Sequence, residues 1–144
     1  MKIKVDLQFI ELEDDNLHLV VASGFKSGET GNWIIDTGAS RTVFDLNLES
    51  LYRLDGEETD QLHTAGIGDK TIKTAVGRLS DFTLGKLTVE NLRVALIDLS
   101  HINRFYAQAA GMQICGLLGS DFLLLHKAVI DFDKKLLILK TLRK

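Results

Sequence analysis

A short apolar run that leads directly into an acidic residue is the most informative stretch of the 144-residue chain. The run is Trp33-Ile34-Ile35, and Asp36-Thr37-Gly38-Ala39-Ser40 follows it. An apolar run of this length is typical of a buried strand, and Gly38 permits a tight turn after the acid. The stretch predicts a strand that presents the Asp36 carboxylate at the floor of a cleft. The alternative is an Asx turn, in which Asp36 accepts hydrogen bonds from nearby backbone N–H groups.

Composition predicts one globular domain, residues 1–144, with 45% hydrophobic and 26% charged residues. The net charge of −3, with both signs interspersed, gives no basic face for nucleic acid. The apolar runs are too short to span a membrane. The chain has one cysteine, Cys115, which cannot form an intrachain disulfide, and the N-terminus does not have the pattern of a signal peptide. We therefore expect a cytoplasmic location.

Alternation of apolar and polar residues predicts short strands along most of the chain. Residues 3–9 and 17–21 are expected to form a hairpin, and further strands are expected at 32–36, 41–44, 79–84, 87–89, 92–97, 114–118, 128–132 and 136–139. Helical segments are expected at 46–54, at 100–110 with Ser100 as the cap, and at 121–125 with Ser120 as the cap. The face of the second of these helices should comprise Ile102, Phe105, Tyr106 and Ala109. The chain is therefore expected to be mostly β.

Residues 61–76 have the composition of a β-hairpin with a glycine-rich tip. Two threonine-rich arms flank the sequence Ala65-Gly66-Ile67-Gly68-Asp69-Lys70. Glycines at the end of a hairpin permit the turn and are expected to leave the tip mobile.

Three features, in order, resemble the retropepsin-like aspartic proteases, the family of the retroviral proteases and their single-lobed bacterial and eukaryotic relatives. They are the Asp-Thr-Gly loop after an apolar strand, the glycine-tipped hairpin, and Leu117-Leu118-Gly119 leading into a helix. The resemblance covers most of residues 32–139. It implies a mostly β acid-protease fold, with a closed β-barrel lobe and two or three short helices. Residues 100–112 form an insertion relative to the compact viral proteases.

The resemblance also implies roles for the matching residues. Asp36 would be the catalytic carboxylate, and Thr37 would donate its hydroxyl to the loop of a partner chain. Gly38 and Ala39 would leave room for the substrate backbone, while Ser40 stands where viral proteases commonly have an acid. The flap that closes over the substrate would be formed by Ala65, Gly66, Ile67, Gly68 and Asp69. Support for the active-site loop would come from Leu117, Leu118 and Gly119.

One Asp-Thr-Gly per chain implies a symmetric homodimer, in which a second copy of Asp36 completes the site. Two carboxyl groups about 3 Å apart share one proton, so one can activate water while the other polarises the peptide carbonyl. In relatives the chain ends form the shared sheet, which makes residues 3–9 and 129–142 the interface candidates. Such an interface should bury roughly 2,000 Å² or more. The expected function is therefore that of an aspartic endopeptidase.

The substrate is expected to bind as an extended peptide between flap and floor. Its side chains would contact an apolar wall formed by Ile67, Ile72, Val76, Leu117 and Leu118. For each of these residues the alternative is packing in the core, which is favoured for any one of them taken alone. A second hypothesis keeps the fold and the dimer, and makes the protein a peptide-binding module without turnover.

A third hypothesis is a cysteine hydrolase, because residues 113–116 partly resemble the caspase nucleophile region and His63 lies upstream. Leu117 replaces the final glycine of that signature, however, and the chain lacks an α/β pattern, so a buried structural Cys115 is favoured. No metal or other cofactor is expected, because the histidines lack metal-ligand spacing. Surface or capping positions are expected for His18, His63, His101 and His126.

Overall fold

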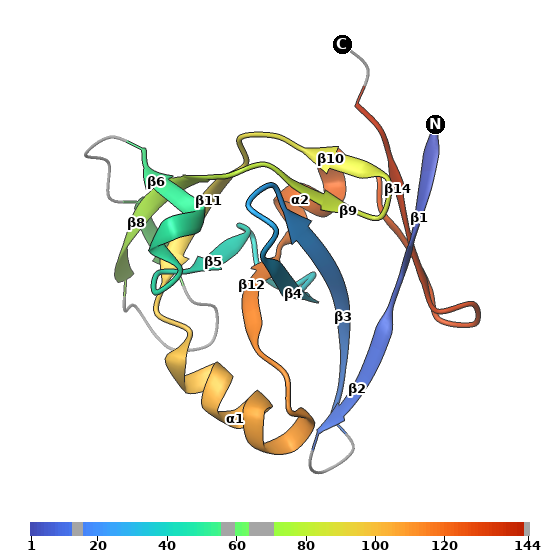
Figure 1. Cartoon of the computed structure of the whole chain (residues 1–144), viewed down its shortest axis with the longest axis horizontal. Helices are drawn as coiled ribbons and strands as arrows, with labels where there is room; N and C mark the ends of the chain where they lie inside the picture. The colour runs from blue at the N-terminus through green and yellow to red at the C-terminus, as the bar shows by residue number, and fades with distance from the viewer. Residues whose placement is uncertain (13–15, 56–59, 64–70, 143–144) are drawn as a thin grey trace.

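The computed structural model describes residues 1–12, 16–55, 60–63 and 71–142 (Figure 1). These residues are mostly in β-strands, with α-helices α1 (Ser100–Ala110) and α2 (Ser120–Leu125) and the short 3₁₀ helix η2 (Glu49–Leu51). The strands are β1 (Lys2–Asp6), β2 (Gln8–Leu12), β3 (Asn16–Phe25), β4 (Thr30–Ile35), β5 (Val43–Asp45), β6 (Tyr52–Leu54), β7 (Asp60–His63), β8 (Thr71–Leu79), β9 (Phe82–Leu84), β10 (Leu87–Val89), β11 (Arg93–Ile97), β12 (Ile114–Leu118), β13 (Val129–Asp131) and β14 (Leu136–Lys140). The expected mostly β class is confirmed.

The larger sheet has 11 strands and curls around the core (Figure 1). Its main path runs β10-β9-β3-β4-β12-β5-β11-β8-β6, while β2 pairs with β3 and β7 with β8. The two ends of this path, β10 and β6, do not pair with each other in the described part of the chain. The sheet is therefore a curled half-barrel, and the expectation of a closed barrel is wrong.

Strands β4 and β12 are parallel neighbours at the centre of this sheet. Their register places Leu117 beside Ile34 and Leu118 beside Ile35. Because parallel strands end at the same edge of a sheet, the residues that follow them lie close together. The two apolar runs of the sequence thus bring Asp36 and Gly119 to one edge.

The core beneath this edge is built around Trp33, whose side chain is fully buried. Its ring stacks on Phe82 with 5.3 Å between centroids, and its indole N–H donates a 3.0 Å hydrogen bond to the Ser23 hydroxyl. On the neighbouring strand, a Cβ at Gly116 would lie 2.3 Å from the Val43 carbonyl oxygen and 2.6 Å from the Trp33 ring. Only glycine fits at that position without displacing a neighbour.

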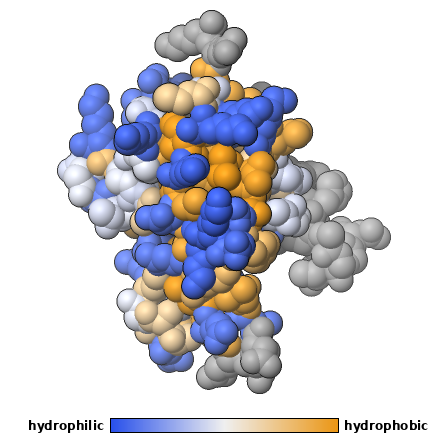
Figure 2. Space-filling model, turned by 90° about the vertical axis from the view of Figure 1, so that its right-hand side faces the viewer, coloured by the Kyte–Doolittle hydropathy of each residue, from blue (hydrophilic) through white to orange (hydrophobic). Residues whose placement is uncertain are grey.

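The N-terminal segment differs from the expected single strand over residues 3–9. It divides at Leu7 into β1, which pairs with β14, and β2, which pairs with β3. Sheet β1-β14-β13 therefore joins the two ends of the chain, and Thr141 N–H donates to the Met1 carbonyl oxygen at 3.0 Å. Figure 2 shows this side of the molecule, on which hydrophobic residues form a band bordered by hydrophilic ones.

The boundaries of helix α1 match the expected residues 100–110, but its expected cap is wrong and its expected apolar face is only partly buried. Ser100 is the first helical residue rather than the cap, and its backbone N–H and hydroxyl both donate to Asp98 Oδ1. Tyr106 is buried, whereas Phe105 is 45% exposed and Ala109 is exposed. Because two residues of the expected apolar face are exposed, this face covers the core only in part.

Two other helical expectations are corrected. Helix α2 begins at Ser120 itself, and the capping position is Gly119. Most of residues 46–54 is not helical, because the 3₁₀ helix η2 gives way directly to β6. No helix in the described ranges is long and apolar enough to cross a membrane.

The arms of the predicted 61–76 hairpin are β7 and β8, which pair antiparallel from Asp60–Thr74 to His63–Thr71. The predicted tip residues Ala65, Gly66, Ile67, Gly68 and Asp69 lie outside the described residues.

Candidate active site

Asp36 immediately follows β4, and its backbone joins the two central strands. Its N–H donates to the Leu118 carbonyl oxygen at 3.0 Å, which extends the β4–β12 pairing by one residue. The Asp36 carbonyl oxygen then accepts a 3.1 Å hydrogen bond from Ala39 N–H, and this closes a tight turn. Asp36 is thus held by the end of a buried strand on one side and by a short turn on the other.

The Asp36 side chain is half-buried and accepts a 3.0 Å hydrogen bond at Oδ1 from Gly38 N–H. This is the contact expected for an Asx turn, so that alternative describes part of the local geometry. A Cβ at Gly38 would lie 3.3 Å from the same Oδ1. Beside the carboxylate, Thr37, Gly38 and Ser40 are exposed, which leaves this edge of the loop open.

A second layer of hydrogen bonds connects the loop to the start of α2. Ser120 N–H donates to the Ala39 carbonyl oxygen at 2.7 Å. The Thr42 hydroxyl accepts from Gly119 N–H at 3.1 Å and donates to Asp121 Oδ1 at 2.8 Å. Asp121 Oδ2 also accepts from Thr42 N–H at 3.1 Å. Together, these bonds fix the loop that carries Asp36 against α2.

Gly119 is required where the two segments meet. A Cβ there would lie 2.7 Å from the Arg41 carbonyl oxygen and 2.8 Å from that of Ala39. Leu118 and Gly119 therefore lie directly against the Asp36 loop, and their supporting role stays a prediction. Sequence reasoning did not identify Thr42 and Asp121. The position of Thr42, a polar residue next to an apolar strand, could have indicated it from the sequence. In the structure its side chain is completely buried.

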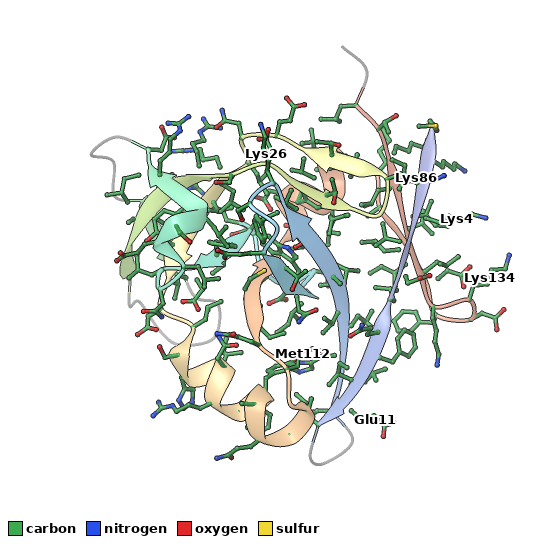
Figure 3. The ribbon with its side chains drawn as sticks, in the orientation of Figure 1. Lys4, Glu11, Lys26, Lys86, Met112 and Lys134 are labelled. Atoms are coloured by element: carbon green, nitrogen blue, oxygen red, sulfur yellow. The ribbon has the colours of Figure 1, made fainter. Side chains whose placement is uncertain are left out.

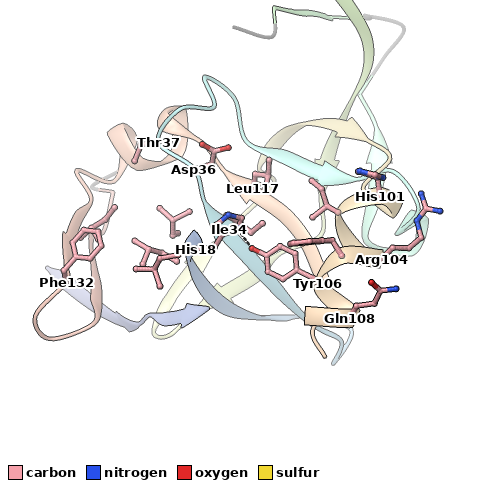
Figure 4. Close-up of a pocket in the computed structure, with 16 residues that line it drawn as sticks. His18, Ile34, Asp36, Thr37, His101, Arg104, Tyr106, Gln108, Leu117 and Phe132 are labelled. Atoms are coloured by element: carbon pink, nitrogen blue, oxygen red, sulfur yellow. Dashed lines mark hydrogen bonds between the residues drawn. The ribbon is translucent and has the colours of Figure 1, made fainter. Parts of the chain in front are cut away.

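The Asp36 carboxylate lines a cavity of about 1110 Å³ (Figure 4). Thr37, Ile34 and Leu117 line it beside the acid, and β3 contributes Leu17, His18 and Leu19. The wall on one side is helix α1, and the segment around β13 adds Ile130 and Phe132. The side chains of α1 that line the cavity are those of His101, Ile102, Arg104, Phe105, Tyr106 and Gln108. Sequence reasoning recognised this helix but did not place it at the site.

The residues expected to form the apolar wall lie in different places. Leu117 lines the cavity, whereas Leu118 is fully buried in the core. Val76 is 3% exposed and does not line this cavity. Ile67 and the side chain of Ile72 lie outside the described part of the structure.

His18 is not in the surface or capping position expected for it. His18 is half-buried in the cavity wall, where Nδ1 is hydrogen-bonded to the Tyr106 hydroxyl. Burial raises the pKa of Tyr106 to about 12, so this hydroxyl stays neutral at ordinary pH. His126 occupies the C-cap of α2, which is one of the expected positions, and its buried side chain contacts the Lys140 carbonyl oxygen through Nδ1 at 2.9 Å. His101 is exposed at the cavity rim, and the side chain of His63 is not among those described.

Cys115 is 3% exposed and belongs to the hydrophobic core. Burial raises the pKa of the Cys115 thiol, which disfavours the thiolate that a nucleophile requires. Its position is that of a structural cysteine, and the geometry gives no support to a cysteine hydrolase. Within the described ranges, no three His, Cys, Asp or Glu side chains gather as metal ligands.

Comparison with known proteins agrees with this geometry. The aspartyl protease family model matches residues 21–122, which is more than half of the chain. Among solved structures, a retropepsin-like aspartic protease from Rickettsia conorii is 20% identical, with a TM-score of 0.54 over 98% of this chain and 91% of that one. The retroviral protease-like domain of Ddi1 from Leishmania major is 13% identical, with a TM-score of 0.55 over 88% of this chain and 94% of that one.

None of the curated proteins matches the sequence. At these identities the two structures establish a shared fold alone, while the family model rests on the sequence itself. With Asp36 and the β12–α2 junction both inside the matched region, the chain belongs to the aspartyl protease family and has the retropepsin-like fold.

Proposed function

We propose that the protein is an aspartic endopeptidase whose active site contains two copies of Asp36, one from each chain of a symmetric homodimer. The observation that carries this proposal is the position of Asp36, whose carboxylate lies at the end of a buried strand and lines a cavity of about 1110 Å³. Membership of the aspartyl protease family supports the same reaction class.

The dimer follows from the number of acids that the cavity offers. Asp36 is the one acidic side chain among the described residues that line it. Peptide hydrolysis by carboxylates needs one ionised group to accept a proton from water and one protonated group to polarise the carbonyl. A second Asp36, brought to about 3 Å by two-fold symmetry, would share a single proton with the first. The exposed Thr37 would then be available to the loop of the partner chain.

The fixed geometry around Asp36 suits this role. Ser120 N–H, Thr42 and Asp121 hold the loop, so little movement is needed to position the carboxylate during reaction. Beside it, Ile34 and Leu117 offer apolar surface to a substrate side chain. We therefore propose an extended peptide as substrate, with an apolar residue next to the cleaved bond.

The test is a peptide-library digest that compares wild type with Asp36→Asn. Asp36→Asn should abolish cleavage, because an amide can neither accept nor share the proton. The matched control is Glu90→Gln, the same change of carboxylate to amide at an exposed residue that does not line the cavity, and it should cleave like wild type. Sedimentation velocity should show a dimer for all three proteins. Full activity in Asp36→Asn, or a monomer that cleaves peptides, would refute the proposal.

A peptide-binding module without turnover remains the second candidate. This candidate requires the same cleft as the peptidase and differs from it only because no peptide bond is cleaved. Wild type that binds peptides from the library but cleaves none of them, over the acidic and neutral pH range, would establish this candidate in place of the peptidase.

A further inference from the structure

We propose that helix α1 forms a subsite for an acidic side chain of the peptide, with Arg104 as the residue that determines this specificity. The acid would bind outside an apolar residue that contacts Phe105 and Leu117. This inference rests on the proposed function and adds the substrate class to it: peptides with an apolar residue at the cut and a glutamate or aspartate farther out.

Helix α1 turns one continuous stripe of side chains toward the cleft. His101, Arg104, Phe105 and Gln108 are spaced i, i+3, i+4 and i+7, which places them on one face of a helix, and all four line the cavity. All four are exposed, including the large aromatic side chain of Phe105, of which 45% remains accessible. The stripe thus combines an apolar centre with polar and cationic side chains at the same cavity wall.

Asn103, on a different face, fixes the helix to the strand that supports Asp36. Its side-chain oxygen accepts a 2.6 Å hydrogen bond from Ile114 N–H, and its amide group donates to the Ile114 carbonyl oxygen at 3.0 Å. At the start of the helix, the buried Asp45 accepts from Leu99 N–H at 3.2 Å. These contacts place the Arg104 stripe at a constant position relative to Asp36, as a binding subsite requires.

Charge favours an acidic occupant. Arg104 is the one lysine or arginine among the described residues that line the cavity, and no ion pair joins it to another residue of the described ranges. Hydrogen bonds from Ser100 and Asn47 are the larger causes that lower the pKa of the nearby Asp98, and the charge of Arg104 helps to lower it further. A guanidinium group binds a carboxylate through two parallel hydrogen bonds. A glutamine or lysine side chain of the peptide cannot form this pair of bonds with Arg104.

The positions of the residues define where the acid would bind. Figure 4 shows Arg104 on the α1 side of the cleft, with Leu117 between it and Asp36. An apolar residue next to the cleaved bond would therefore lie over Leu117 and Phe105, and the acidic residue would lie farther from the cut. In a symmetric dimer, the partner's copy of α1 would create the same preference on the other side of the cut.

The test uses peptides of equal length that share apolar residues at the cut and differ at one outer position. Glutamate, glutamine and lysine are compared at the second, third and fourth residues from the cut, on each side. Wild type should cleave the best glutamate peptide with about fivefold higher kcat/KM than its glutamine counterpart, as expected for an exposed ion pair. The lysine peptide should be poorer still. The preference should weaken as the salt concentration rises.

Arg104→Glu should reverse the order of the glutamate and lysine peptides, and Arg104→Gln should remove the difference. Lys26→Glu makes the same charge change at an exposed residue that does not line the cleft and lies far from α1 (Figure 3), so it should keep the wild-type order. A wild-type enzyme with no charge preference, or a preference unchanged in Arg104→Glu, would overturn the subsite and leave the peptidase function intact.

Binding separates the subsite from turnover. The same peptides, labelled with a fluorophore, are titrated against Asp36→Asn with and without Arg104→Glu, and fluorescence anisotropy is measured. One outcome is that wild type cleaves none of the peptides while the anisotropy titrations show a glutamate preference in binding that depends on Arg104. That result would support the subsite and refute the peptidase function. Absence of both cleavage and binding would overturn both.

Discussion

The hydrogen bonds of Thr42 give the sharpest test of how the Asp36 loop is held. Thr42→Val keeps the shape of the side chain and removes its hydroxyl. Gly119 N–H then loses its 3.1 Å acceptor, and Asp121 Oδ1 loses its 2.8 Å donor. Thr42 is completely buried, so water cannot easily replace the bond to Gly119 N–H. Asp121 is exposed, and its Oδ1 still accepts from Phe122 N–H at 2.8 Å. A buried group left without its partner costs about 1–3 kcal/mol, so the unpaired Gly119 N–H should lower the free energy of unfolding by about 2 kcal/mol.

The measurement is urea unfolding of wild type and Thr42→Val at equal protein concentration, because a dimer makes stability depend on concentration. Thr88→Val is the matched control, since Thr88 occupies an exposed strand position. It should change stability by less than about 0.5 kcal/mol. If Thr42→Val is as stable as Thr88→Val with an unchanged m-value, the Thr42–Asp121 contacts do not hold the loop, and the reasoning is refuted.

Two further predictions concern the core and the start of α1. Gly116→Ala should destabilise the fold by about 3 kcal/mol or more in urea unfolding, because the new Cβ would meet the Val43 carbonyl oxygen at 2.3 Å. Gly24→Ala, with its nearest contact at 3.6 Å, should cost far less, and equal losses would contradict the close packing. Hydrogen bonds from Ser100 lower the pKa of Asp98 from 3.8 to about 2, so its stabilising contribution is present above about pH 4 and is lost as the pH falls to about 2. Asp98→Asn should therefore flatten the loss of Tm over this interval in calorimetric scans, and a slope equal to that of wild type would count against the prediction.

The sequence predicted the parts of the site that local patterns define. The apolar runs before Asp36 and Gly119 predicted buried strands, and the structure has β4 and β12 there. The boundaries of α1 followed from its helical periodicity. Residues 128–139 also form the expected hairpin, β13–β14.

Parts that depend on tertiary partners could not be predicted in this way. The alternation of residues 3–9 continues through Leu7, so it gives no sign that the strand changes partner there. Helical spacing groups Phe105 with Tyr106, but it does not say that Phe105 stays exposed while Tyr106 is buried, although both line the cleft. The Thr42–Asp121 contact joins residues 79 positions apart, and no local pattern indicates such a pair.

The separation of Thr42 and Asp121 by 79 positions in the sequence has a consequence for biosynthesis. The loop that carries Asp36 is held by groups from residues 118–121, so it cannot adopt its final geometry until that segment has left the ribosome. Contacts this distant in sequence form slowly, because the intervening chain must lose conformational entropy first. A nascent chain therefore carries Asp36 long before it carries an ordered site, and its carboxylate is held in place only after most of the sheet has been made.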